Sequence, residues 1–198
     1  MAAFALGFRD AALNGLARHL PNLLTTLRIA AAPALALLLV SGSDRAALGV
    51  FAFAGLSDAA DGFLAKRFGL TTRFGRLLDP AADKLLMLVS FATLTLLGVA
   101  PLWLTLVVLV RDVAILAGLL VARLLNVPVM VAPLLIGKAS TAMQIIYIAL
   151  ALVLLTFGLQ WPQMQTVAAD VTAILTSVSG LCYAVVGAKA FARPRRTA

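Results

Sequence analysis

The stretch "DAADGFLAKRFGLTTRFGRLLDPAADK", residues 58–84, decides the architecture, because it places four aspartates inside a chain that is 63% hydrophobic. Asp58 and Asp61 are three residues apart, and Asp79 and Asp83 are four apart. Residues at these spacings lie on one face of a helix. The segment "RFGLTTRFG" between the two pairs has the glycines and polar residues of a turn. The pattern predicts two antiparallel helices that bring the four carboxylates together.

Apolar segments on both sides of this stretch predict an all-α integral membrane protein. The chain has 198 residues, a mean hydropathy of +1.05 and only 12% charged residues. A membrane-spanning helix needs about 20 mostly apolar residues. Six predicted transmembrane helices meet this requirement, at roughly 22–40, 46–66, 81–99, 102–124, 134–157 and 167–189. They use most of the chain, so one membrane domain over residues 1–198 is expected.

The two ends of the chain differ in composition from these spans. Residues 4–20 place apolar side chains near one side at helical spacing and polar side chains elsewhere. This pattern predicts an amphipathic helix in the membrane interface, and a frayed terminus is the alternative. No cleaved signal sequence is expected there. Residues 190–198 include "ARPRRTA", which we interpret as a basic tail for anionic head groups.

Basic residues gather at alternate connections between the predicted spans. The positive-inside rule therefore places both termini and the aspartate stretch in the cytoplasm, as expected for a bacterial inner membrane protein. This distribution also explains the net charge of +8 without a nucleic-acid partner. The residues on the predicted cytoplasmic side are Arg9, Arg18, Lys66, Arg67, Arg73, Arg76, Arg123, Lys138, Lys189, Arg193, Arg195 and Arg196.

Four carboxylates in membrane helices need a compensating charge. Each costs about 2.5–3.5 kcal/mol on the insertion scale, and neighbouring carboxylates repel unless a cation lies between them. An all-oxygen ligand set favours Mg²⁺ or Mn²⁺, and a cluster of four can hold two ions. Two ions can stabilise both the attacking and the leaving oxygen of a phosphoryl transfer. The alternatives are an interfacial salt-bridge network with nearby lysines and arginines, and the cation site of a transporter.

The order of these residues resembles the signature of the CDP-alcohol phosphotransferases. The matching string is Asp58-x2-Asp61-Gly62-x2-Ala65-Lys66-x8-Gly75-x3-Asp79-x3-Asp83. The resemblance extends to "PNLLTTLR" at the first predicted span and "GK" at the fifth. It implies a six-helix bundle, usually a homodimer, with its active site open to the cytoplasm. Members transfer a phosphatidyl group from a CDP-linked lipid, CDP-diacylglycerol, to an alcohol and release CMP.

The resemblance also implies roles for individual residues. Asp58, Asp61 and Asp79 would hold two divalent cations, and Asp83 would be both a ligand and the general base. The signature usually has arginine where this chain has Lys66, and lysine offers a point charge in place of a bidentate fork. Small residues at 62 and 65 could equally serve helix packing. The expected contacts of the CDP-lipid are Asn22, Thr25, Gly62, Ala65, Lys66 and Gly75.

Two cations outside the signature indicate an acceptor that carries a phosphate. Arg111 lies within the fourth predicted span, and Lys138 begins the fifth. A buried cation near a phosphoryl-transfer site is typical of phosphate binding. Lys138 could instead extend to the interface as a snorkelling side chain. A pair between Arg111 and Asp112 is not expected, because adjacent residues on a helix do not face each other.

Two acceptors carry such a phosphate. Glycerol 3-phosphate would give phosphatidylglycerophosphate, and phosphatidylglycerol would give cardiolipin. Enzymes of the first kind typically carry a second arginine eight residues after the first, where this chain has Leu119. Fewer cations suit the single charge of a phosphodiester. Together with "RDV", "ALGVFAFAGLSD" and "GKASTAMQ", this resembles the mitochondrial-type cardiolipin synthases, so phosphatidylglycerol is the expected acceptor.

Overall fold

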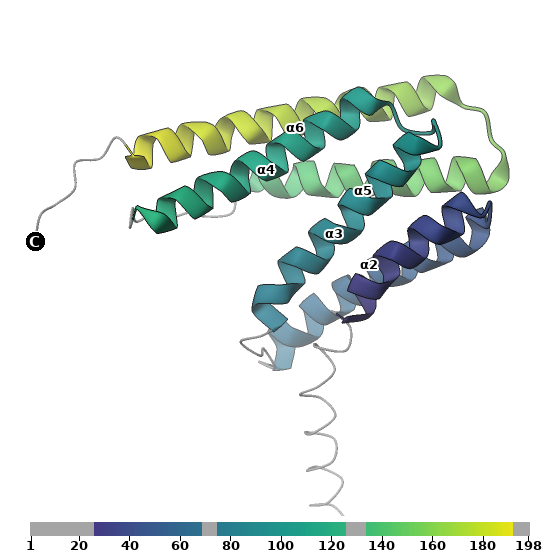
Figure 1. Cartoon of the computed structure of the whole chain (residues 1–198), viewed down its shortest axis with the longest axis horizontal. Coiled ribbons are helices and arrows are strands. Elements are labelled where there is room, and N and C mark those ends of the chain that lie inside the picture. Colours follow the sequence, from purple (N-terminus) through teal and green to yellow (C-terminus); the bar gives the residue numbers. More distant parts are fainter. Residues whose placement is uncertain (1–25, 69–74, 126–133, 192–198) are drawn as a thin grey trace, which may run out of the picture. The chain divides into compact units, whose positions relative to one another are not determined.

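The computed structural model describes residues 26–68, 75–125 and 134–191, and between 58 and 83 it describes the backbone alone. Within these ranges the chain is helical and forms no strand, which confirms the all-α prediction for them (Figure 1). The helices are Thr26–Val40, α2 (Asp44–Phe68), α3 (Gly75–Leu96), α4 (Leu102–Leu124), α5 (Leu135–Phe157) and α6 (Pro162–Phe191).

These helices follow the six predicted apolar segments. By length and composition, α4, α5 and α6 are each able to cross a membrane. The helix Thr26–Val40 and the Lys84–Leu96 part of α3 are apolar but shorter. The described helices therefore indicate a membrane protein, while the crossing of all six remains a prediction. The predicted interfacial helix at 4–20 and residues 192–198 of the predicted tail lie outside the described residues, and the first two tail residues, 190 and 191, belong to α6.

Three connections are closed by a glycine in the left-handed conformation. Gly42, Gly98 and Gly158 have φ angles of 72°, 71° and 63°, which glycine adopts without steric cost. In each turn the amide after the glycine donates to the carbonyl oxygen five residues before it, at 2.8–2.9 Å. This bond is the one that terminates a helix in a Schellman motif. The turns therefore end their helices sharply at residues 41–43, 97–101 and 158–161.

The chain divides into two compact units, Met1–Thr93 and Leu94–Ala198. In the first unit, the buried side chains of each helix recur at helical spacing and form one stripe. Apolar members of these stripes are Ala32, Leu35 and Leu39 in the first helix, Ala47, Phe51 and Ala54 in α2, and Leu86, Met87 and Phe91 in α3.

In the second unit, α6 packs against both α4 and α5 (Figure 1). Polar side chains are buried in this contact as well as apolar ones. The Ser140 and Thr176 hydroxyl oxygens lie 3.1 Å apart, and the Gln144 amide donates to Thr176, also at 3.1 Å. All three residues are fully buried. Hydrogen bonds of this kind hold helices together in a bilayer, where no hydrophobic driving force acts between them.

Candidate functional site

The aspartate signature lies on two consecutive helices. Asp58 and Asp61 belong to the second half of α2, and Asp79 and Asp83 belong to the first half of α3. The two aspartates of each pair are about one turn apart in a continuous helix, since a turn has 3.6 residues. The predicted turn between the pairs contains residues 69–74, which lie outside the described residues. Because the four side chains are also outside that description, their mutual approach remains a prediction.

The expected CDP-lipid contacts lie around the same connection. Gly62, Ala65 and Lys66 are in the last turns of α2, and Gly75 is the first residue of α3. The remaining two expected contacts, Asn22 and Thr25, lie outside the described residues. The roles of all six residues therefore remain predictions.

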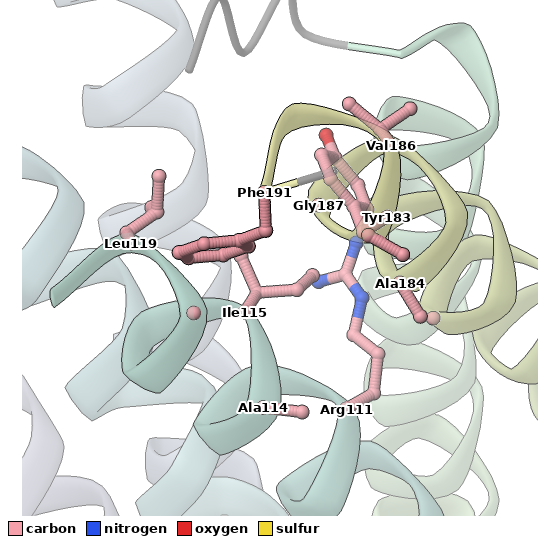
Figure 2. A pocket seen from close by; sticks show the side chains of 12 residues that line it. Arg111, Ala114, Ile115, Leu119, Tyr183, Ala184, Val186, Gly187 and Phe191 are labelled. Atoms are coloured by element: carbon pink, nitrogen blue, oxygen red, sulfur yellow. The ribbon is translucent and has the colours of Figure 1, made fainter. Parts of the chain in front are cut away.

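Arg111 is the predicted site residue whose surroundings the structure describes in full. It belongs to the buried stripe of α4 with Leu104 and Val108, and only 8% of its surface is exposed. One terminal guanidinium nitrogen donates to the Ser179 hydroxyl at 2.8 Å. The guanidinium carbon lies 5.7 Å from the centroid of the Tyr183 ring, within the range of a cation–π interaction (Figure 2). α4 therefore directs this cation toward α6.

The other terminal nitrogen of Arg111 donates to the Asp112 carboxylate at 2.7 Å. The expectation that these neighbours would not pair is therefore wrong. The β-carbons of adjacent residues point about 100° apart on a helix, but the arginine side chain is long enough to turn back to its neighbour's carboxylate. The Asp112 carboxylate compensates the buried positive charge of Arg111 even when no ligand is bound. Arg111 therefore has a structural role in addition to any role in binding.

Tyr183 links Arg111 to the beginning of α5. A β-carbon at position 137 would lie 2.8 Å from the Tyr183 hydroxyl oxygen, so the ring occupies this place because residue 137 is glycine. Lys138 follows directly and its side chain is exposed. Tyr183 thus lies beside Arg111, near the middle of α4, and beside Gly137, which directly precedes Lys138. The exposed lysine is consistent with both interpretations of it, phosphate binding and snorkelling.

The sequence reasoning missed Ser179 and Tyr183. A signal for them exists in α6, where Thr172, Thr176, Ser179 and Tyr183 recur at intervals of four, three and four residues. This spacing places polar side chains along one face of a helix. The first three are fully buried, so the polar face of α6 points into the protein.

A cavity of about 250 Å³ lies beside Arg111, between the second half of α4 and the end of α6 (Figure 2). Arg111 is its charged residue, and the other lining residues are apolar or glycine apart from Tyr183. The lining residues include Ile115, Gly118, Leu119, Gly187 and Phe191. The position eight residues after Arg111, Leu119, therefore presents an apolar side chain to this cavity.

Comparisons with known proteins agree with the resemblance drawn from the signature. The sequence model described as CDP-alcohol phosphatidyltransferase matches residues 18–181. The chain is 32% identical to the cardiolipin synthase (CMP-forming) of Homo sapiens over 86% of this chain and 62% of that protein. It is 39% identical to the cardiolipin synthase (CMP-forming) of Streptomyces coelicolor over 72% of this chain and 67% of that protein.

A third relative carries a different name. The chain is 33% identical to the probable phosphatidylglycerophosphate synthase of Mycobacterium tuberculosis, over 83% of this chain and 79% of that protein. This chain spans less than two thirds of the human relative, so the comparison with that protein concerns only the shared part. The match to the family model covers most of the chain and includes the whole aspartate signature. The chain therefore belongs to the CDP-alcohol phosphatidyltransferase family.

Proposed function

We propose that this chain is a metal-dependent enzyme that transfers a phosphatidyl group from CDP-diacylglycerol to an alcohol and releases CMP. The observation that carries the proposal is the aspartate signature on α2 and α3, in a chain that belongs to this family. Two acidic residues one turn apart on each helix offer a compact set of oxygen ligands.

The chemistry of these positions fits divalent cations. Carboxylates are hard oxygen ligands of the kind that Mg²⁺ and Mn²⁺ prefer. In the proposed site, Asp58, Asp61, Asp79 and Asp83 would hold two such ions. When bound, the ions neutralise the charge that develops on the transferred phosphoryl group and orient the pyrophosphate.

The residues of the chain would then act as follows. Asp83 accepts the proton of the acceptor hydroxyl, and the oxygen of that hydroxyl bonds to the β-phosphorus of CDP-diacylglycerol. The bond between this phosphorus and the bridging oxygen breaks, and CMP leaves with that oxygen. Lys66 holds the pyrophosphate as a point charge. No serine or cysteine nucleophile is needed, because the acceptor attacks directly.

Phosphatidylglycerol is the acceptor that we propose, with cardiolipin as the product. The names of the human and Streptomyces relatives favour this product, and Leu119 gives the cavity beside Arg111 an apolar wall. Arg111 and Lys138 would bind the acceptor phosphate. Glycerol 3-phosphate is the second candidate, favoured by the name of the Mycobacterium relative.

The membrane arrangement completes the proposal. All six helices cross a bacterial inner membrane, residues 4–20 lie in its interface, and both termini and the active site face the cytoplasm. The positive-inside distribution of lysine and arginine supports this orientation. The active form is a homodimer, as the family resemblance implies.

The proposal predicts CMP release that requires both a divalent cation and phosphatidylglycerol. Purified protein is incubated with CDP-diacylglycerol and Mg²⁺ or Mn²⁺, and each acceptor is offered separately while CMP and lipid products are measured. We expect cardiolipin from phosphatidylglycerol and little or no product from glycerol 3-phosphate. Glycerol 3-phosphate has no acyl chains, so nearly all of its affinity must come from charges and hydrogen bonds.

Two other outcomes would show that the proposed acceptor or the proposed enzyme class is wrong. Efficient phosphatidylglycerophosphate formation without cardiolipin would make glycerol 3-phosphate the acceptor. Cation flux into liposomes that contain the protein, without CMP release under any acceptor, would favour the transporter and refute the enzyme. Omission of the cation and omission of the acceptor are the two controls.

A second prediction concerns the unusual lysine of the signature. If Lys66 binds the donor pyrophosphate as a point charge, Lys66→Ala should lower kcat/KM for CDP-diacylglycerol by about tenfold or more, which corresponds to about 1.4 kcal/mol. Lys66→Arg should keep most of the activity, because the positive charge remains. Arg67→Ala is the matched control, since position 67 lies about 100° further round the helix. Loss of activity in Arg67→Ala alone would assign the contact to Arg67.

A further inference from the structure

We propose that the cavity between α4 and α6 holds the first part of one acyl chain of phosphatidylglycerol whose phosphate lies at Arg111. This inference rests on the proposed function and adds a lateral binding slot for the lipid acceptor. Three features of the cavity carry it, namely its size, its glycines and the unused donor of the arginine.

The size of the cavity fits a piece of a lipid. Its volume is about 250 Å³, below the ~300–1,000 Å³ of pockets that enclose a drug-sized ligand. A whole phospholipid is therefore too large, while a run of methylene groups fits. Leu119 and Phe191 line the cavity and are 37% and 41% exposed. The cavity thus reaches the surface of the second unit, where the rest of the chain would continue into the bilayer.

Two glycines, Gly118 and Gly187, line this space. A β-carbon added to Gly118 or Gly187 would meet no atom within 4 Å. The backbone of α4 and α6 at these positions therefore lines open volume, without close packing against a neighbour. Ile115 and Phe191 lie beside the Arg111 guanidinium on the wall of the cavity (Figure 2). Their side chains offer dispersion contacts to a hydrocarbon chain.

Arg111, the charged residue of the cavity lining, has a buried hydrogen-bond donor without a partner in the described part of the chain. Arg111 is more than nine-tenths buried, and its Nε has no hydrogen-bond partner among the described residues. Its two terminal nitrogens are already engaged by Asp112 and Ser179. A buried donor without a partner costs free energy, and a small shift of the side chain toward the cavity would let an anionic oxygen satisfy it. A phosphodiester oxygen attached to an apolar chain matches a buried N–H donor beside an apolar slot.

The slot should act mainly by positioning the acceptor. An acyl chain in the bilayer is already in an apolar medium, so its entry into the slot gains little from the hydrophobic effect. It gains van der Waals contacts and restricts where the head group lies. Correct orientation of the reacting hydroxyl increases the rate of such a reaction. A filled slot should therefore impair use of the lipid acceptor and leave donor binding intact.

The test fills the slot with a side chain. In Gly118→Leu and Gly187→Leu we expect kcat/KM for dioleoylphosphatidylglycerol to fall about tenfold or more. Glycerophosphoglycerol, which has the same phosphodiester and no acyl chains, should be used or bound equally by these variants and the unsubstituted enzyme. Gly49→Leu is the matched control, because Gly49 is an exposed helical glycine of α2 that also has open space around it.

Lipid binding is measured separately from turnover. The full chain is titrated with dioleoylphosphatidylglycerol, and bound lipid is measured by native mass spectrometry. Dioleoylphosphatidylcholine is the zwitterionic control, and binding of CDP-diacylglycerol tests whether the donor site is intact. We expect both leucine variants to bind the first lipid about tenfold more weakly and CDP-diacylglycerol normally. Leu119→Ala widens the slot without filling it and should weaken the same binding about threefold.

The outcomes separate the slot from the proposed function. Unchanged phosphatidylglycerol binding and turnover in all three variants would refute the slot while leaving cardiolipin synthesis in place. If the unsubstituted protein makes no cardiolipin but binds phosphatidylglycerol, and the leucine variants lose this binding, the slot is supported and the proposed acceptor reaction is refuted. Equal weakening in Gly49→Leu would also refute the slot, because the effect would then not depend on the cavity.

Discussion

Asp83→Asn is expected to lower the rate of CMP release by at least about 100-fold, even at saturating Mg²⁺. Asparagine keeps the size of the side chain and one oxygen ligand but loses the charge and the basicity. A general base contributes about 10²–10⁴-fold, and weaker cation binding would add to the loss. The rate is measured with CDP-diacylglycerol and phosphatidylglycerol across a titration of Mg²⁺.

Asp170→Asn is the matched control for this prediction. Asp170 is an exposed residue of α6, outside the signature, and its replacement should leave the rate unchanged. If additional Mg²⁺ restores the full rate of Asp83→Asn, then Asp83 is a metal ligand only. A different residue must then accept the proton.

Arg111→Ala is expected to abolish cardiolipin formation while CDP-diacylglycerol still binds. The substitution removes the proposed phosphate contact, and it also leaves the Asp112 carboxylate and the Ser179 hydroxyl without this partner. Removing one member of a fully buried ion pair costs about 3–5 kcal/mol of stability, and a smaller cost is expected here because the Asp112 side chain is 16% exposed. Activity must therefore be expressed per folded protein, with thermal stability and donor binding measured in parallel.

A double variant separates the two roles of Arg111. Arg111→Ala combined with Asp112→Ala removes both charges, so it should recover part of the stability that the single variant loses. Cardiolipin formation should remain absent, because the phosphate contact is still missing. Ser179→Ala removes one hydrogen bond from the guanidinium and keeps the cation, so it should retain most of the activity. Recovery of synthesis in the double variant would make Arg111 a purely structural residue.

Helix positions could be predicted where apolar composition and helix ends coincide. The segment predicted at 102–124 is α4 itself, because Pro101 precedes it and most of the stretch is apolar. α6 begins at Pro162, five residues before its predicted start, because proline suits the first turn of a helix and the polar residues after it are helical but not apolar. Hydropathy finds the part of a helix inside the membrane, and the helix itself extends further.

The candidate site was predictable only in part, for a similar reason. Spacing along α2 and α3 identified the aspartate pairs, and the observed helices preserve this spacing. The partners of Arg111 depend on how α6 is rotated against α4, which no local pattern in α4 determines. The bond to Asp112 depends on the length and flexibility of one side chain. The rule that adjacent residues on a helix do not face each other considers only the directions of the β-carbons, so it does not predict this bond.

The Arg111–Asp112 pair also bears on how the protein enters the membrane during synthesis. An arginine or aspartate at the centre of a helix costs about 2.5–3.5 kcal/mol at the translocon. Ser179 cannot offset this cost at that moment, because α6 follows α4 in the chain and leaves the ribosome later. Asp112 is available at once, being the next residue, and at 2.7 Å it neutralises the guanidinium within one segment. α4 is thus able to enter lipid with its two central charges paired before its tertiary partners have been translated, and its remaining cation, Arg123, lies in the last turn.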